Sequence, residues 1–316
     1  MRSRSMRVAP ALVLLLVATA CSKSDSPSTG AGGGSSATTS AMELASTDLY
    51  VGAPQRVQVG IFNSTPAGGV QLLTSGTIQL TLAPYQGGTG TPISGSARYL
   101  GAPGTEADTG TPHLTDPSVG RGVYELDGTF DRPGIWQATG TFTLGGTQQQ
   151  LTATFPVLAK PRLPAPGQKA LKTVNLTMAS KVNPQAIDSR AQDGQPIPDP
   201  QLHRDTIAGA IAAHRAALVL FATPVYCQSQ FCGPSADALE RIAETGPKDA
   251  DYIHVEIWKD FGAHEVNAAA AAWVYRDGDL TEPWLFLIAP NGTIVDRWAP
   301  LFDPAQVMAE LRKVAG

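Results

Sequence analysis

The chain has 316 residues, enough for two domains of ordinary size, and its 42% hydrophobic content can support real cores. It holds 32 Gly and 25 Pro but only 16% charged residues, a balance that disfavours coiled coils and helical repeats. The formal net charge of −4 argues against nucleic acid as a partner. There are three cysteines, an odd number, so at least one of them has no partner within the chain.

The N-terminus has the pattern of a secretory leader. Three arginines precede an apolar run over residues 9–18, and small residues come directly before Cys21. The apolar run is too short to span a bilayer in the mature protein. Residues 17–21 resemble a bacterial lipobox, which implies a signal peptide over residues 1–20 and a lipidated Cys21. The folded part would then lie outside the cytoplasm, in the periplasm or at the cell surface. An ordinary signal peptide with a chance cysteine is the alternative.

Two regions of different character follow the leader. Residues 21–42 are rich in Ser, Gly and Thr without periodicity, and are predicted to form a flexible tether. Over residues 43–159, apolar and polar residues alternate in runs separated by Gly, Pro, Asn and Thr, which predicts half-buried strands of an antiparallel β-sandwich. Its last part resembles small immunoglobulin-like bacterial modules. The alternating positions are Val57, Val59, Ile61; Ile78, Leu80, Leu82; Trp136, Ala138, Phe142, Leu144; and Leu151, Ala153, Phe155, Val157.

A proline-rich stretch separates this region from the last one. Residues 160–200 contain seven prolines and little apolar periodicity, and are predicted to be an extended linker. Residues 201–316 then alternate between helical and strand patterns, which predicts an α/β domain. The predicted elements are helices over 206–214, 235–243 and 268–274, strands over 217–221, 252–258, 284–288 and 293–298, and a final helix capped by Asp303 with Pro304 in its first turn.

The remaining two cysteines lie where the buried strand 217–221 leads into the next helix. Cys227 and Cys232 are separated by four residues, and Gly233-Pro234 follows them. A helix N-terminus offers free amide donors and a positive dipole end, which stabilises a thiolate and lowers the cysteine pKa. Since the lipid would occupy Cys21, the other two form an even pair whose disulfide can persist in oxidising surroundings. The arrangement favours redox chemistry.

From about Thr206 to Ala315 the chain resembles the thioredoxin superfamily. The resemblance rests on the buried strand, the loop ending Cys232-Gly233-Pro234, a proline directly before an apolar strand, and a hairpin followed by an amphipathic helix. It implies that Cys227 attacks and Cys232 resolves, and that Pro283 corresponds to the family's cis-proline beside the cysteines. The residues that the resemblance places in the substrate groove are Phe231, Glu282 and Trp284.

The sequence departs from the family at two places that bear on mechanism. Thioredoxins have two residues between their cysteines, so their redox potential does not transfer to a four-residue spacing. The family's buried acid, which assists proton transfer, falls at Leu220 here. Glu256 on the neighbouring strand could substitute for that acid, but a strand-end carboxylate facing solvent is the favoured interpretation.

These features lead to one main hypothesis and two alternatives. The main hypothesis is a membrane-anchored thiol–disulfide oxidoreductase that acts on protein thiols or disulfides and needs no cofactor. One alternative is an SCO-like copper-binding protein, in which the soft thiolates of Cys227 and Cys232 and the imidazole of His264 hold copper. The other is a binding module whose disulfide only staples a loop. His203 and His214 are predicted to be solvated, and His254 to lie within a strand.

Overall fold

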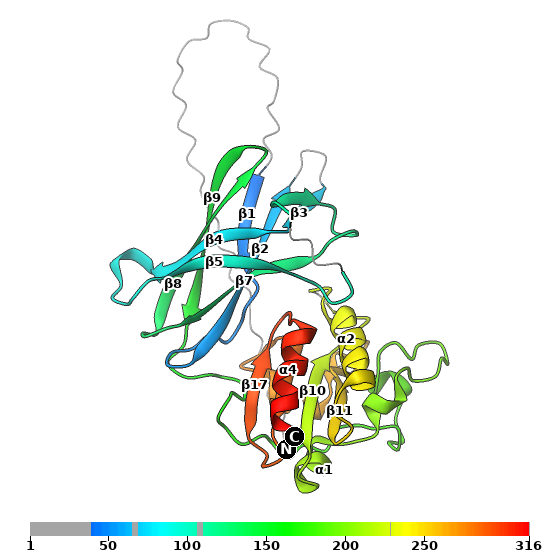
Figure 1. Ribbon diagram of the computed structural model, residues 1–316. Helices are drawn as coiled ribbons and strands as arrows, with labels where there is room; N and C mark the ends of the chain where they lie inside the picture. Colours follow the sequence, from blue (N-terminus) through cyan, green and yellow to red (C-terminus); the bar gives the residue numbers. More distant parts are fainter. Residues whose placement is uncertain (1–38, 65–68, 106–109, 228, 316) are drawn as a thin grey trace, which may run out of the picture. The chain divides into compact units, whose positions relative to one another are not determined.

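Antiparallel strands make up the first part of the chain in the computed structural model, which describes residues 39–64, 69–105, 110–227 and 229–315. Their hydrogen-bonded order is β6-β3-β2-β7-β5-β4-β8-β9, and β1 pairs with β2 (Figure 1). The strands are β1 (Thr39–Leu44), β2 (Pro54–Ser64), β3 (Val70–Thr74), β4 (Thr77–Pro84), β5 (Ile93–Gly101), β6 (His113–Thr115), β7 (Gly122–Thr129), β8 (Gly134–Leu144) and β9 (Thr147–Val157).

The alternation in the sequence places one face of these strands in a shared core. In β4, Ile78, Leu80 and Leu82 are buried while the residues between them are not. Trp136 of β8 is also buried, and its ring meets that of Phe130 edge to face at 4.9 Å. The strands from β6 to β9 form one continuous hydrogen-bonded path, β1 also lies near β9, and the inward side chains share a single core.

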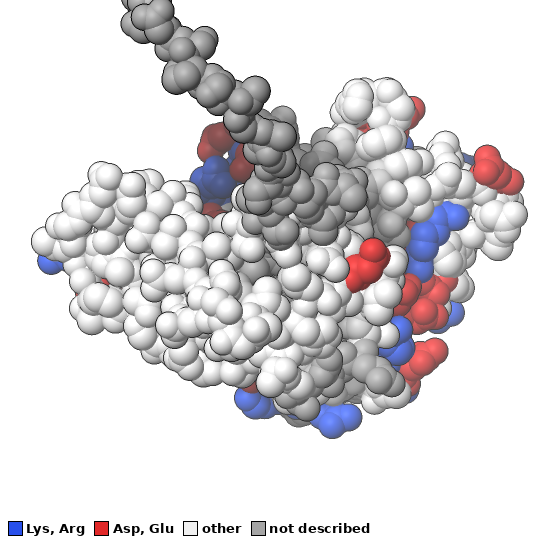
Figure 2. Space-filling view, turned by 90° about the horizontal axis from the view of Figure 1, so that it is seen from above, with Lys and Arg blue, Asp and Glu red and all other residues white. Residues whose placement is uncertain are grey.

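Charged side chains are sparse on part of the surface. Residues 57–97 contain no Lys, Arg, Asp or Glu. The face in Figure 2 shows a broad area without such residues, with the charged side chains gathered toward its edges. Apart from Arg98, the exposed positions of β4 and β5 are filled by uncharged polar residues, which present hydroxyl and amide groups to water. These residues are Thr77, Gln79, Ser94 and Ser96.

The proline-rich segment 160–200 has no strand of its own but is packed against the sheet that follows it. Leu163 and Ala170 join the core of the later part of the chain. The amides of Gly167 and Ala170 donate to the carbonyls of Ile294 and Gly292, at 2.9 Å each. Further along, the segment is buried again at residues 186–189. The segment therefore contributes side chains to the interior. Its proline-rich composition had predicted only an extended linker.

A four-stranded sheet forms the centre of the last part of the chain. Its order is β11-β10-β16-β17, with β10 parallel to β11 and antiparallel to β16. All seven residues of β10 are buried, as expected for a continuous apolar run in the middle of a sheet. The strands are β10 (Ala216–Ala222), β11 (Ala250–Glu256), β16 (Trp284–Ile288) and β17 (Ile294–Trp298).

Helices cover both faces of this sheet. The first face packs on α1 (Ile207–Ala212) and α3 (Ala268–Val274), and the second on α2 (Cys232–Thr245) and α4 (Pro304–Val314). None of the described helices is long and apolar enough to cross a membrane. Two small strand pairs complete this part: β12 (Trp258–Asp260) with β13 (Glu265–Val266), and β14 (Tyr275–Arg276) with β15 (Asp279–Leu280).

Polar contacts join the antiparallel strands to the four-stranded sheet. Asp48 accepts from Arg297 of β17 at 2.8 Å, and both side chains are buried. Gln58 of β2 is fully buried and donates to the carbonyl of Leu301 at 2.9 Å. These contacts lie within the compact unit formed by residues 37–316.

Candidate functional site around the Cys227–Cys232 disulfide

The two cysteines predicted to form a pair do so. Cys227 lies in the loop after β10, Cys232 is the first residue of α2, and a disulfide joins them with their Cα atoms 5.9 Å apart. The buried strand β10 fixes one end of the loop and helix α2 fixes the other. The disulfide therefore lies between the end of β10 and the N-terminus of α2. The strand-to-helix position expected from the sequence is confirmed.

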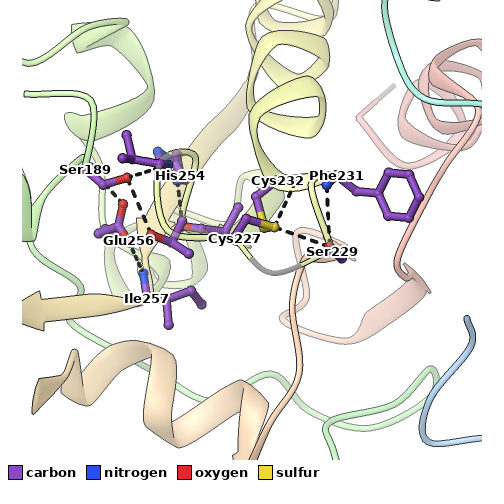
Figure 3. The surroundings of a disulfide bond; sticks show 11 residues. Ser189, Cys227, Ser229, Phe231, Cys232, His254, Glu256 and Ile257 are labelled. Carbon is purple, nitrogen blue, oxygen red and sulfur yellow. Dashed lines mark hydrogen bonds between the residues drawn. A yellow bond between two sulfur atoms is a disulfide. The ribbon is translucent and has the colours of Figure 1, made fainter. Parts of the chain in front are cut away.

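The two sulfurs differ in environment. Cys227 is half-buried, whereas Cys232 is fully buried. Cys227 Sγ accepts from the backbone amide of Cys232 at 3.3 Å and lies 3.3 Å from Ser229 Oγ (Figure 3). Only Cys227 is therefore open to attack from outside, and it is also the sulfur that already receives a hydrogen bond from the helix.

The N-terminus of α2 is not neutralised by its own residues. Phe231, at the cap position, offers no capping side chain, and no acidic residue lies in the first turn. The positive end of the helix dipole thus faces the disulfide without a competing carboxylate from the helix itself. Such a position favours a thiolate over a thiol once the disulfide opens.

Glu282 is the acidic side chain beside the disulfide. One of its carboxyl oxygens and the two sulfur atoms all lie within 4.8 Å of one another. Its Oε2 atom is buried and has no hydrogen-bond partner among the described residues. Burial, followed by the negative charge of Glu256, raises the pKa of Glu282 to about 8. This carboxyl group is consequently protonated at neutral pH.

A cavity of about 480 Å³ is lined by residues that flank the disulfide, including Tyr226, Ser229 and Glu282, but by neither cysteine. The Tyr226 and Phe261 rings stack at 3.9 Å between centroids, and Trp258 meets Phe261 edge to face at 5.4 Å. The peptide bond before Pro283 is cis. The cavity therefore combines apolar aromatic walls with a carboxyl group and a hydroxyl; its lining includes Tyr226, Ser229, Trp258, Phe261, Glu282 and Pro283.

The structure places the three predicted groove residues and the cis-proline Pro283 in different surroundings. Glu282, Pro283 and Trp284 line the cavity beside the disulfide. Trp284 is nevertheless only 4% exposed, and its indole nitrogen donates to Thr281 Oγ1 at 3.0 Å. Phe231 points away from the two cysteines (Figure 3) and packs instead against a cluster that includes Leu301. Phe231 thus does not share the cavity of the other three.

His264, the proposed third copper ligand, is not grouped with the cysteines. Among the His, Cys, Asp and Glu side chains of the described residues, Glu282 is the one that brings a potential metal-ligand atom, a carboxyl oxygen, within 4.8 Å of both sulfurs. His264 is exposed in the turn between β12 and β13, and its ring lies 6.0 Å from that of Phe261. The sulfurs themselves are bonded to each other, so in this form they are not free thiolates.

Glu256 is buried, contrary to the prediction that it faces solvent. It is 1% exposed at the end of β11 and accepts from the amides of Ser189 at 2.8 Å and Ile257 at 2.9 Å (Figure 3). Burial raises the pKa of Glu256, and the charge of His254 and the hydrogen bonds from Thr223 and Ser189 oppose that shift. The prediction was wrong because the segment 160–200, which the sequence presents as a linker, folds over this strand end and supplies Ser189.

A second polar group lies wholly in the interior. The side chains of Asp188, His203 and His254 are fully buried. Asp188 Oδ2 lies 3.3 Å from His203 Nε2 and 3.3 Å from His254 Nδ1, and it also accepts from Arg190 Nη2 at 2.7 Å. The prediction that His203 is solvated was therefore wrong. His214 is exposed, and His254 lies within a strand as predicted.

This buried group resembles a metal-binding set in composition, but the Asp188 oxygens and His254 Nε2 already have polar partners. The Asp188 carboxylate is paired with Arg190 through both oxygens. His254 has its other ring nitrogen 3.1 Å from the carbonyl oxygen of Ala222. A metal ion would have to displace these contacts in a fully buried place, so the arrangement fits a structural ion network better than a metal centre.

The resemblance placed Glu282 near the cysteines through its neighbour Pro283, but its contact with both sulfurs, like that of Asp188 with the two histidines, carries no local sequence signal. Each depends on segments that are distant in sequence, and a single sequence shows only residue spacing. Cys21, the predicted lipidation site, lies outside the described residues. No protein-family profile, curated protein or solved structure matches this chain.

Proposed function

We propose that the protein carries out thiol–disulfide exchange with protein substrates through Cys227 and Cys232. The observation that carries this proposal is the unequal exposure of two bonded sulfurs at one helix end. Cys227 is half-buried and hydrogen-bonded to a helix amide, whereas Cys232 is fully buried behind it. The helix end would stabilise a Cys227 thiolate, and Cys232 would act only after Cys227 has reacted.

The finer fold assignment belongs to the same proposal. Residues 201–316 would form a thioredoxin-like α/β domain, residues 43–159 an immunoglobulin-like β-sandwich domain, and residues 160–200 their connection. Support for the first comes from a central strand with one parallel and one antiparallel neighbour, covered by helices on both faces. The aromatic cavity beside Pro283 would take the substrate segment that carries the reacting sulfur.

The proposed location follows from the leader. A lipid on Cys21 would anchor the protein outside the cytoplasm, with residues 21–42 as a tether. Disulfides form and persist in such compartments, so the pair could cycle between oxidised and reduced forms there.

Trapping of the attacking thiol tests the proposal. All variants carry Cys21→Ser, so that Cys227 and Cys232 are the only cysteines that can react. Reduced Cys232→Ser should form a stable mixed disulfide with oxidised glutathione on Cys227, located by peptide mass mapping. Reduced Cys227→Ser should react at least about tenfold more slowly, because Cys232 is buried. Alkylation of Cys227 should also titrate well below the ordinary thiol pKa of about 8.5.

Two results would contradict the proposal. Equal reaction rates at the two cysteines would mean that the helix end does not activate Cys227. Titration at or above about 8.5 would favour a disulfide that only staples the loop. In either case the binding-module alternative would gain support.

A further inference from the structure

The carboxyl group of Glu282, a half-buried residue, is not used by the exchange scheme above. It lies within 4.8 Å of both sulfurs, and one of its oxygens is buried with no hydrogen-bond partner among the described residues. A buried polar atom without a partner is costly in a folded protein. Its position beside a reactive bond suggests that the missing partner appears during the reaction.

The neighbouring acid, Glu256, does not offer the same opportunity. Both of its oxygens accept hydrogen bonds from backbone amides, including those of Ser189 and Ile257. Those bonds favour the ionised form and hold the carboxylate in place. Glu256 is therefore suited to act on Glu282 through its charge, whereas Glu282 has an oxygen free to exchange a proton.

Opening of the disulfide creates a need for that proton. When an external thiolate attacks the half-buried Cys227, the leaving group is Cys232, which is fully buried. A bare thiolate is poorly stabilised away from water, because burial disfavours the charged form. A proton donor at the sulfur would remove this cost.

We propose that Glu282 is the acid–base group of the disulfide, giving its proton to the Cys232 sulfur as the bond opens and taking it back as the bond closes. This inference rests on the proposed thiol–disulfide exchange. Burial, followed by like-charge repulsion from Glu256, raises the pKa of Glu282 to about 8 and keeps it protonated in the oxidised form at neutral pH. Glu282 is then ready to donate before the reaction begins.

The step balances in electrons and protons. An external thiolate forms a bond to Cys227 Sγ, the Cys227–Cys232 bond breaks, and its electron pair goes to Cys232 Sγ. The proton of Glu282 passes to that sulfur, and the carboxylate regains a proton from solvent. A second external thiolate then displaces Cys227, which leaves as a thiolate. In sum, the protein disulfide is reduced by two electrons and two external thiols are oxidised to a disulfide.

The experiment is a single-turnover reduction of the oxidised protein by glutathione across pH 6 to 10, in protein carrying Cys21→Ser. Acid quenching and mass spectrometry follow disulfide opening, and rates are expressed per glutathione thiolate. Near pH 7, the disulfide of Glu282→Gln should open about 10 to 100 times more slowly than that of the parent. This factor reaches only the lower end of the usual contribution of acid–base catalysis. The difference should vanish above about pH 9, because the parent's Glu282 has lost its proton there.

Two further variants test the assignment independently of the Gln substitution. Glu282→Asp keeps a carboxyl group and should retain the pH inflection. Glu256→Gln removes the repelling charge and should move the inflection to lower pH. Glu244→Gln, on the exposed side of α2, is the control and should behave like the parent protein.

The outcomes separate the inference from the function on which it rests. If the parent opens normally and Glu282→Gln opens at the same rate at every pH, the inference is overturned and the exchange proposal stands. A slowing that is the same at all pH values would assign Glu282 a merely structural role and would also overturn it. If glutathione never forms a mixed disulfide with Cys227 in the parent, the exchange proposal fails and the inference fails with it.

Discussion

The surroundings of His254 favour its charged form, because both of its ring nitrogens face groups that can only accept. Nδ1 lies 3.3 Å from the Asp188 carboxylate, and Nε2 lies 3.1 Å from the carbonyl oxygen of Ala222. Although burial alone would lower it, the hydrogen bond and charge of Asp188 raise the pKa of His254. His203 behaves in the opposite way. Its Nδ1 is buried with no hydrogen-bond partner among the described residues, and burial lowers its pKa despite Asp188.

The joint contribution of these two histidines to stability is therefore predicted to be largest near pH 6.5. The raised pKa of His254 gives stability that is present below the unfolded value of about 6.5 and is lost as pH rises through the folded value. The lowered pKa of His203 means that the unfolded state binds more protons below pH 6.5, so stability falls as pH drops. Each slope should approach at most about 1.4 kcal/mol per pH unit.

Urea unfolding between pH 5 and 8 measures this effect. His254→Gln should flatten the alkaline side, and His203→Gln the acid side. His214→Asn is a suitable control, because His214 is exposed and its backbone is left-handed, with φ at 53°. Asn tolerates that conformation. If both core variants keep the pH profile of the parent, the assigned charge states are wrong.

At the residue scale, local chemistry was predictable and long-range contacts were not. The pair Cys227 and Cys232 stands out because its spacing and the adjacent strand and helix are visible in one stretch of sequence. The Asp188 group escaped prediction because its members come from the proline-rich segment, the short 3-10 helix before α1, and the edge strand β11. Nothing in the sequence shows that these three segments meet.

At the scale of elements, strong periodicity predicted the strands and helices well. The run 217–221 became β10, and the alternating positions of β4 and β8 became a buried face. The segment 160–200 was harder, because its burial comes from backbone hydrogen bonds to the turn before β17 and from scattered apolar residues. Such packing leaves no period in the sequence.

The N-cap of α4 was predicted correctly, and its contribution can be measured. Asp303 Oδ1 accepts from the amides of Ala305 at 2.9 Å and Gln306 at 3.4 Å. Asp303→Ala should lower the free energy of unfolding by about 1 kcal/mol, because these amides lose their acceptor. Asp303→Asn should restore most of it. Since Asp303 also pairs with the half-exposed Arg98, Arg98→Ala controls for the ion pair; an equal loss in Arg98→Ala would assign the effect to that pair instead.

At the scale of the whole described unit, one buried ion pair connects strands that are far apart in sequence. Asp48 precedes β2, and Arg297 belongs to β17; their side chains meet at 2.8 Å. The Arg297 guanidinium also lies over the Trp284 ring at 4.9 Å and donates to the carbonyl of Pro164 at 3.0 Å. One side chain therefore contacts the first strands, the proline-rich segment and the four-stranded sheet.

Removal of that guanidinium should weaken the unit as a whole. Arg297→Met keeps the length of the side chain but leaves the Asp48 carboxylate buried without its main counter-charge, which typically costs about 3 to 5 kcal/mol. Arg162→Met is the matched control, because Arg162 approaches the same carboxylate only to 3.9 Å and is 39% exposed. Its loss should cost at most about 1 kcal/mol. Denaturant unfolding that shows the same loss for both variants would mean that Asp48 does not depend on Arg297, and that other contacts hold the two sheets together.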